Sequence, residues 1–317
     1  MKGRLPSTLQ EAIVYFSDLD VATDFVRDIR WPNGVECPTC GSKQVTYLST
    51  RRVWKCKNEH TRKQFTVKLG TIFEDSALGL DRWLPAVWLV TNCKNGISSY
   101  ELASHLGVTQ KSAWFMLHRV RLAMQSRSFE KLSGEVEADE TFIGGKGKNM
   151  HKDRKRRVQM SSQKGEKTIV LGLLQRETGE FRAKVAPNRR KHPIHENIKE
   201  NVNPGSILYT DVHHGYDDLP DEIMRQAVDH ISSYVHGRVH VNGVENFWSL
   251  LKRTLGGTYV SVDPVHLFRY LDEQCFRFNR RYLSDAERFA LVIGQVIGRR
   301  ITYAELTGKT ESPDTQA

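Results

Sequence analysis

Three acidic residues in the second half of the chain have positions that suit the binding of divalent metal ions. Asp139 lies in the alternating run 135–143, which predicts a β-strand, and Asp211 ends the short apolar strand 207–211. Glu245 lies in a run whose apolar residues recur at helical spacing. Carboxylates from two strands and one helix can hold two Mg²⁺ or Mn²⁺ ions, which activate the attacking oxygen and stabilise the leaving oxygen in phosphodiester cleavage. The sequence therefore predicts a catalytic triad of acids.

Other charged residues surround these acids in the sequence. Glu137 and Glu140 share the strand with Asp139 and compete with it for metal, although acids at such positions are more often solvated than catalytic. Lys252 lies two turns after Glu245 on the same helical face, and with Arg253 it is expected to contact DNA phosphates. A basic segment follows the strand of Asp139 and is expected to track the DNA backbone. Its candidate contacts are Lys152, Arg154, Lys155, Arg156 and Arg157.

A second set of candidate metal ligands lies near residue 40. Cys37 and Cys40 form a CxxC pair followed by glycine, and Cys56 and His60 come next. Thiolates at this spacing bind one ion from a tight turn, and four protein ligands close a tetrahedral zinc site. We expect a Cys3His site with structural Zn²⁺ that supplies much of the folding energy of so small a unit. The alternative is a CxxC turn with an unrelated later Cys and His.

Residues 79–126 have the pattern of a helix-turn-helix unit. Helices are predicted over 81–91, from Ser98 or Ser99 to residue 106, and over 110–124, with Gly107 at the turn. The third helix would read DNA from its N-terminal end. Its expected base contacts are Gln110, Lys111 and Ser112, and its expected phosphate contacts are His118, Arg119 and Arg121. The alternative is an ordinary helical hairpin.

Composition favours a nucleic-acid partner. The 317 residues include 47 Lys and Arg against 37 Asp and Glu, which gives a formal net charge of +10. Such an excess of cations attracts phosphates. The 39% hydrophobic content supports folded cores, and no run is long and apolar enough for a membrane span or a secretory signal. A cytoplasmic, nucleoid-associated protein is expected.

The predicted fold is multidomain α+β. An N-terminal helical segment over 1–33 precedes the β zinc ribbon of 34–75 and the helical unit of 79–126. Alternating strands and helices over 134–300 form an α/β domain with a mixed sheet, in which the strands 135–143, 168–174 and 181–185 make an antiparallel meander. A helix and the strand-like run 231–235 follow Asp211. The polar tail 308–317 is expected to be disordered.

Together these segments resemble a family of bacterial insertion-sequence transposases, the DDE transposases with an N-terminal zinc ribbon of the insertion-sequence fifteen-ninety-five group. The resemblance covers most of the chain. The matching segments are Arg30–Gly34, Cys37–Gly41, Gly70–Phe73, Ser98–Arg121, Glu137–Thr141, Tyr209–Asp211 and His240–Glu245. The chain departs from the family pattern where Cys56 and His60 replace a second CxxC pair.

The resemblance implies an RNase H-like catalytic domain in which Asp139, Asp211 and Glu245 match the family's catalytic acids. It also implies cleavage at transposon ends and transfer of the freed 3′-hydroxyl to target DNA. The expected partners are double-stranded DNA, as terminal inverted repeats and target, and further copies of this chain in a homo-oligomer on DNA. Two other classes remain open: a DNA-binding regulator without catalysis, and an RNase H-like nuclease without strand transfer.

Overall fold

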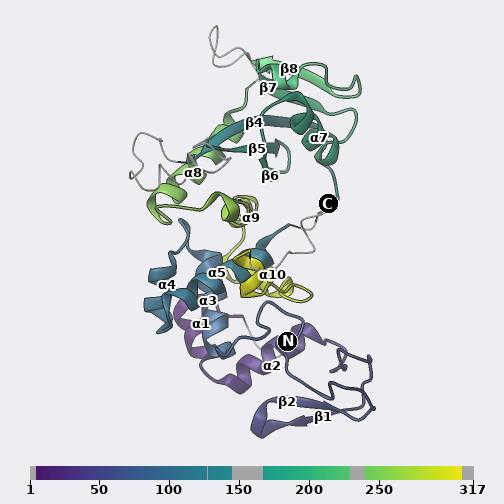
Figure 1. Ribbon diagram of the computed structural model, residues 1–317, viewed down its shortest axis with the longest axis vertical. Helices are drawn as coiled ribbons and strands as arrows, with labels where there is room; N and C mark the ends of the chain where they lie inside the picture. Colours follow the sequence, from purple (N-terminus) through teal and green to yellow (C-terminus); the bar gives the residue numbers. More distant parts are fainter. Residues whose placement is uncertain (1–4, 127, 145–166, 229–239, 309–317) are drawn as a thin grey trace. The chain divides into compact units, whose positions relative to one another are not determined.

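The computed structural model describes residues 5–126, 128–144, 167–228 and 240–308 (Figure 1). The chain forms two compact units, each with its own core. One unit comprises the residues up to Gln125 together with those from Tyr282 onward, and the other comprises Ser126–Arg281. None of the helices in the described ranges is both long and apolar enough to cross a membrane.

The first unit contains a small three-stranded sheet. Strands β1 (Val45–Leu48), β2 (Val53–Cys56) and β3 (Gln64–Phe65) pair antiparallel in the order β1-β2-β3, within the segment 34–75 that was predicted to form a β zinc ribbon. Because side chains alternate across a strand, aromatic rings gather on one face of this sheet. Trp54 packs between the rings of Tyr47 and Phe65, and Trp31 covers the group.

The helical part of the first unit follows the predicted pattern closely. Its helices are α1 (Leu9–Phe16), α2 (Leu19–Arg30), α3 (Leu80–Asn92), α4 (Ser99–Leu106) and α5 (Gln110–Met124). Ser98 and Thr109 accept backbone hydrogen bonds at the starts of α4 and α5, as their types predict. Gly107 turns the chain between these two helices at φ 61°, where glycine carries no steric cost.

The C-terminal helices correct the boundary expected at residue 300. Helices α10 (Asp285–Gly294) and α11 (Tyr303–Leu306) belong to the first unit, because α10 packs on α3 and contributes Phe289 to its core. The Phe289 ring contacts Phe16, Phe25 and Trp88. The α/β unit therefore ends at Arg281, and the last predicted part of that domain folds onto the N-terminal helices instead.

The second unit is built on a mixed five-stranded sheet with the order β6-β5-β4-β7-β8. Its strands are β4 (Glu135–Ile143), β5 (Thr168–Gln175), β6 (Phe181–Ala186), β7 (Ile207–Asp211) and β8 (Met224–Val228). The first three form the predicted antiparallel meander, whereas β7 runs parallel to β4 and β8 runs parallel to β7. Strand β8 occupies part of the segment where a helix was expected, and that expectation was wrong.

Helices cover both faces of this sheet because apolar side chains of the central strands point alternately to one face and to the other. Leu171 and Leu173 face a core that includes α7 (Lys191–Asn201). Val170 and Leu174 face a core with α8 (Asn242–Gly257) and α9 (Leu267–Asn279). The short 3-10 turns η3 (His214–Tyr216) and η4 (Pro264–His266) complete the unit. The expected strand at 231–235, the tail after residue 308, and Lys152, Arg154, Lys155, Arg156 and Arg157 lie outside the described residues.

Candidate functional site

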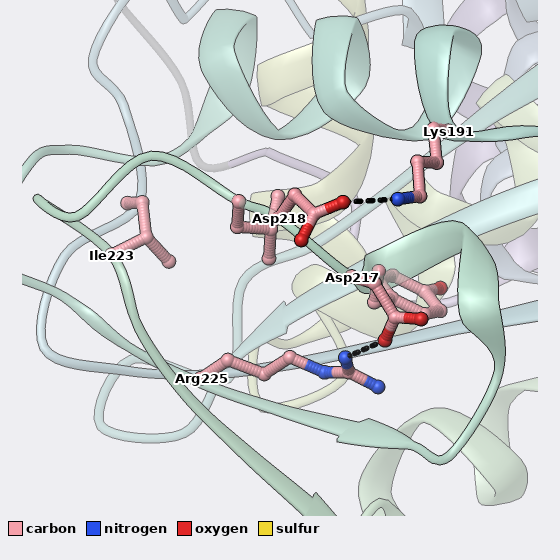
Figure 2. Close-up of a pocket in the computed structure, with 7 residues that line it drawn as sticks. Lys191, Asp217, Asp218, Ile223 and Arg225 are labelled. Carbon is pink, nitrogen blue, oxygen red and sulfur yellow. Dashed lines mark hydrogen bonds and ion pairs between the residues drawn. The ribbon is translucent and has the colours of Figure 1, made fainter.

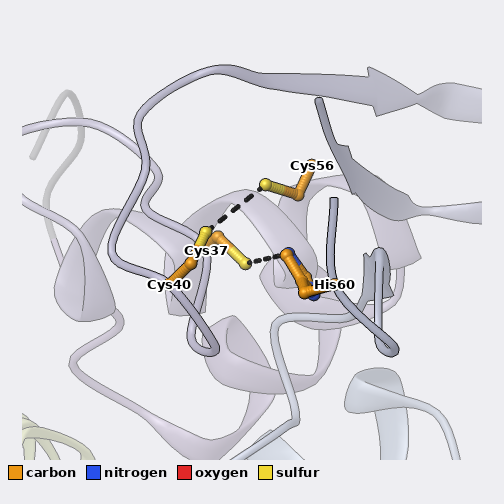
Figure 3. A group of neighbouring side chains, drawn as sticks. All are labelled: Cys37, Cys40, Cys56 and His60. Atoms are coloured by element: carbon orange, nitrogen blue, oxygen red, sulfur yellow. Dashed lines mark hydrogen bonds between the residues drawn. The ribbon is translucent and has the colours of Figure 1, made fainter. Parts of the chain in front are cut away.

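The four predicted zinc ligands come together in the N-terminal sheet region (Figure 3). One donor atom from each of Cys37, Cys40, Cys56 and His60 lies within 4.8 Å of all the others. The Cys40 and Cys56 sulfurs are 3.7 Å apart, and His60 Nε2 is 3.4 Å from Cys37 Sγ. Two sulfurs bound to one tetrahedral zinc lie about 3.8 Å apart, so the arrangement fits the ion. It also identifies His60 as the fourth member of the set.

The electrostatics of the cluster favour a thiolate at Cys37. Burial opposes ionisation of this thiol. Hydrogen bonds from the backbone at Cys40 and Thr39 and from the Cys40 and Cys56 side chains together outweigh burial, so the pKa of Cys37 is lowered to about 6. Burial raises the pKa of the Cys56 thiol. One sulfur is therefore ready to bind a cation near neutral pH, and the others would lose their protons on binding.

The predicted acid Asp139 lies on the central strand β4 under helix α8. Its Oδ2 accepts a hydrogen bond of 2.9 Å from Nε1 of Trp248, a residue of α8. The pKa of Asp139 is raised to about 7. Burial is the largest cause and the charges of Glu140 and Asp211 add to it, against backbone and Trp248 hydrogen bonds that lower the pKa. A carboxylate in this setting is stabilised by a bound cation.

Asp211 is the last residue of β7, the strand next to β4. The two strands pair in parallel from Glu135 and Ile207 to Glu137 and Tyr209. Asp139 and Asp211 each lie two residues beyond that last pair, so they fall on the same face at matching positions on neighbouring strands. The Asp211 Oδ1 accepts a 3.0 Å hydrogen bond from the backbone N–H of His213.

Arg225 of β8 fixes the backbone around Asp211. Its guanidinium donates to Thr210 Oγ1 and to the Asp211 carbonyl, each at 3.0 Å, and forms an ion pair of 2.6 Å with Asp217. Figure 2 shows this ion pair beside the pair of Lys191 and Asp218 in a pocket of about 460 Å³. Charges of both signs line the pocket, and its cations are already engaged by aspartates. It therefore supports the loop after Asp211 and offers no site of its own.

Glu245 lies in the first turn of α8, at an exposed position. Val244, Phe247, Trp248 and Leu251 bury the opposite side of the helix, so the predicted helical register is confirmed. Lys252 and Arg253 are exposed on the same helix. The donor atoms of the four ribbon residues lie within 4.8 Å of one another. Among the described residues, the oxygens of Asp139, Asp211 and Glu245 do not form such a tight group.

The two competing acids of β4 have different surroundings. Glu140 accepts a 3.1 Å hydrogen bond from the hydroxyl of Tyr216, and burial followed by the charge of Asp211 raises its pKa. Tyr216 belongs to the core on the α7 side, so Glu140 points away from α8. Glu137 points toward α8 and is 2% exposed in its side chain. Neither acid is solvated, contrary to the ordinary expectation for such positions.

The N-terminal end of α5 carries the three predicted base contacts. Lys111 is exposed and its ammonium lies 4.6 Å from the ring centre of Tyr303. Gln110 and Ser112 are half-buried; Gln110 donates to Ser99, and Ser112 is bonded to the helix cap Thr109. The helix start is thus accessible through Lys111 most of all.

Arg119 and Arg121 do not lie on an exposed face of α5, which corrects the expectation that they reach phosphates. Arg119 is 3% exposed and donates to the carbonyl oxygens of Ile72, Glu74 and Ile301, while Arg121 is 0% exposed. His118 is buried as well. Segments far away in the sequence cover this side of the helix, so these side chains stabilise the fold of the first unit.

Several residues that support the acids escaped the sequence analysis. Trp248, Tyr216 and Arg225 were not among the predicted site residues, yet each touches an acid or its strand end. Gly172, which pairs with Asp139 in the sheet, lets Trp248 approach the strand closely. A glycine in the middle of an otherwise apolar strand was the available signal, because it marks close approach by another group.

Replacing Gly172 by alanine is expected to lower the free energy of unfolding by about 1–3 kcal/mol, the usual cost of overpacking. A Cβ there would lie 2.5 Å from Trp248 Cζ2 and 2.7 Å from Phe181 Cζ, and neither ring can yield easily. Urea denaturation measures the change. Gly256→Ala in α8 is the control, because nothing lies within 4 Å of its added Cβ. Equal effects of the two changes would contradict the packing argument.

Comparison with known proteins identifies the family. A family model for the ISXO2-like transposase domain matches residues 131–279, and one for the transposase zinc-ribbon domain matches residues 18–61. The chain is 30% identical over 282 residues to the uncharacterized protein in transposable element ISH50 of Halobacterium salinarum, which covers 85% of this chain and 93% of that protein. It is 33% identical over 96 residues to an uncharacterized transposase-like protein of Haemophilus influenzae, or 30% of this chain and 77% of that protein. The chain therefore belongs to the ISXO2-like family of insertion-sequence transposases, and a transposase zinc ribbon forms part of its N-terminal unit.

Proposed function

We propose that this transposase cuts DNA at the ends of its element and joins the freed 3′-hydroxyl to target DNA, with Asp139, Asp211 and Glu245 as its catalytic acids. The observation that carries the proposal is the matched placement of Asp139 and Asp211 on neighbouring parallel strands, under the helix that carries Glu245 in its first turn. An RNase H-like fold for the second unit is part of the proposal, supported by its mixed sheet with helices on both faces.

The donor set suits Mg²⁺ or Mn²⁺. Three carboxylates offer hard oxygens and negative charge. Burial and the charges of Glu140 and Asp211 raise the pKa of Asp139, so a bound cation would favour its ionised form. When bound, such ions would activate the attacking oxygen and stabilise the leaving oxygen. The protein's own part is to orient the acids: Trp248 holds Asp139, the His213 amide holds Asp211, and α8 presents Glu245.

Strand cleavage and strand transfer are tested separately on labelled duplexes that carry the element's ends. The proposal expects Mg²⁺-dependent nicking of the intact duplex, and joining of a pre-cut end with a free 3′-hydroxyl to a second duplex. A nuclease without transfer would nick and never join, and a regulator would bind without either reaction. Binding without metal-dependent cleavage would therefore overturn the proposal.

DNA binding is proposed to involve the exposed face of the zinc ribbon as well as the start of α5 and the residues Lys252 and Arg253 of α8. The strand register aligns Thr46, Lys55 and Gln64 in one exposed row, on the face opposite the aromatic rings. Lys57 and Arg62, each two residues along the chain from a member of this row, are exposed as well. Because Arg119 and Arg121 are buried, these ribbon cations are the better candidates for phosphate contacts in the first unit.

The double change Lys55→Ala and Arg62→Ala is expected to weaken DNA binding and to reduce its dependence on salt. Each phosphate contact contributes about 0.9 to the slope of log K against log salt concentration, so two lost contacts reduce the slope by about 1.8. Fluorescence anisotropy with labelled DNA, at salt concentrations from low to moderate, measures this slope. Lys63→Ala is the matched control, since Lys63 is already paired with Glu59. An unchanged slope in the double variant would exclude the ribbon face as a phosphate contact.

The proposed partners are double-stranded DNA, as terminal inverted repeats and target, and further copies of this chain. Joining two ends to one target requires both ends to be held at once, so a homo-oligomer on DNA is expected. Sedimentation of the protein with end DNA would show complexes that contain more than one chain.

A further inference from the structure

Helix α8 lacks a cap of its own, and β4 supplies one. The residue before the helix, Val241, provides no side-chain hydrogen bond to the first turn. The first N–H groups of a helix need acceptors from elsewhere when they are buried. The Oε2 atom of Glu137 accepts from the backbone N–H groups of Gly243 at 2.8 Å and Val244 at 3.1 Å. An anion at this end of the helix is also favoured by the helix dipole.

The Glu137 carboxylate is itself held by a guanidinium. Arg176 donates from Nε to Glu137 Oε1 at 2.8 Å, and from its second amino group to the carbonyl of His240 at 2.6 Å. It also pairs with Glu135 at 3.1 Å and lies 4.0 Å from the ring centre of Tyr209. One arginine thus joins β4 and β7 to the segment that leads into α8.

The close approach of α8 to the strand needs a glycine at its second position. A Cβ at Gly243 would lie 2.9 Å from Glu137 Oε2 and 2.3 Å from Leu174 Cδ2. Any larger residue would push the first turn away from β4. The glycine and the buried acid are therefore two halves of one contact.

A second contact follows one turn later. Trp248 of α8 donates to Asp139, two residues along β4 from Glu137. Glu245 lies between Val244 and Trp248, so the helix is attached to the strand on both sides of it. Because a helical turn is stiff, these two attachments fix where the Glu245 backbone lies relative to Asp139.

We propose that Glu137 is a positioning residue, which caps α8 from the strand of Asp139 and thereby sets Glu245 in place for shared metal binding. This inference rests on the proposed function, since it assigns Glu245 to the metal site. Glu137 is buried and fully engaged by N–H groups, so it is not itself a ligand. The same segment of sequence therefore supplies one catalytic acid, Asp139, and the anchor for another.

Glu137→Ala should free the first turn of α8 without removing any metal ligand. The first expected result is faster amide hydrogen exchange over residues 243–246. The second is weaker Mn²⁺ binding when the protein is titrated with Mn²⁺. The third is DNA cleavage at least tenfold slower than wild type, partly restored by a high Mn²⁺ concentration. Glu137→Gln keeps an oxygen for the two amides and should fall between Ala and wild type. Glu135→Gln is the control, because Glu135 shares Arg176, whereas the Gly243 and Val244 amides of α8 donate to Glu137.

The readouts separate this inference from the proposed function. Faster exchange and weaker Mn²⁺ binding in Glu137→Ala, with Glu135→Gln unchanged, support the positioning role. Unaltered exchange and Mn²⁺ binding in Glu137→Ala would overturn it, even if the wild-type protein cleaves DNA. A wild-type protein that cuts no DNA contradicts the proposed function, while the exchange and Mn²⁺ measurements still decide the role of Glu137. If Glu137→Ala does not fold, Glu137→Gln provides the same comparison.

Discussion

Asp211→Asn is expected to slow Mg²⁺-dependent cleavage by about a hundredfold to a thousandfold, the order seen when one preorganised electrostatic group is removed from an active site. The change keeps the size of the side chain and the acceptor for the His213 amide, so the end of β7 should stay folded. It removes one negative charge from a site that must attract cations. Cleavage rates at saturating DNA, with binding measured in parallel, test the prediction.

The control for Asp211→Asn is Asp218→Asn in the loop that follows. Asp218 is exposed and pairs with Lys191, but it lies outside the group of acids that raise the pKa of Asp139. This variant should cleave at nearly the wild-type rate. Cleavage that survives Asp211→Asn and depends on Mg²⁺ as before would remove Asp211 from the centre. An equal loss in both variants would point to loop folding rather than to metal binding.

Local sequence patterns were sufficient to predict most strands and helices of both units. Strand β4 begins and ends where the alternation of its residues predicts, and the caps Ser98 and Thr109 mark the starts of α4 and α5. The zinc cluster was predictable for the same reason, because its ligands are close together in the sequence and its spacing is dictated by the ion. Short-range chemistry decides these features.

Contacts between distant segments were not predictable from such patterns. Arg119 and Arg121 lie on the side of α5 that would be polar in an isolated helix, but residues 72–74 and 301 cover part of that side. Trp114 and Phe115 on the same helix were a usable signal, since an aromatic pair outside the main apolar stripe indicates a second packing partner. Strand β8 was missed because its residues do not alternate.

The role of Glu137 shows the same limit within the candidate site. In the sequence it is one of four acids in the run 135–140, and nothing local distinguishes it from Asp139. The difference arises from the packing of α8, which lies more than a hundred residues later in the chain. Glu137 accepts from the backbone amides of this helix, and Asp139 accepts from the indole of Trp248. Side-chain roles in this site therefore depend on tertiary packing, although the face of each residue follows from the strand period.

Removal of zinc is expected to unfold the ribbon while the α/β unit stays folded. Structural zinc in small domains binds with an apparent free energy of about 10–16 kcal/mol at pH 7, more than three short strands can replace. Metal analysis should find one zinc per chain. After chelation the tryptophan fluorescence should change, because Trp54 stacks within the ribbon and would lose its packed surroundings. Mg²⁺ is restored after dialysis, so that any change in cleavage reflects zinc alone.

A single substitution separates this effect from general chelation. Cys40 is exposed, so Cys40→Ser removes a ligand without disturbing a core, and it should abolish stoichiometric zinc and weaken DNA binding. Cys93→Ser, in the same unit but outside the cluster, should change neither. Cys40→Ser protein that retains a full zinc equivalent would show that the four residues do not form the site. The ribbon face is built on the three strands that the metal holds together, so loss of zinc should also destroy this face. If DNA affinity is retained after loss of zinc, DNA recognition is assigned to the helices instead.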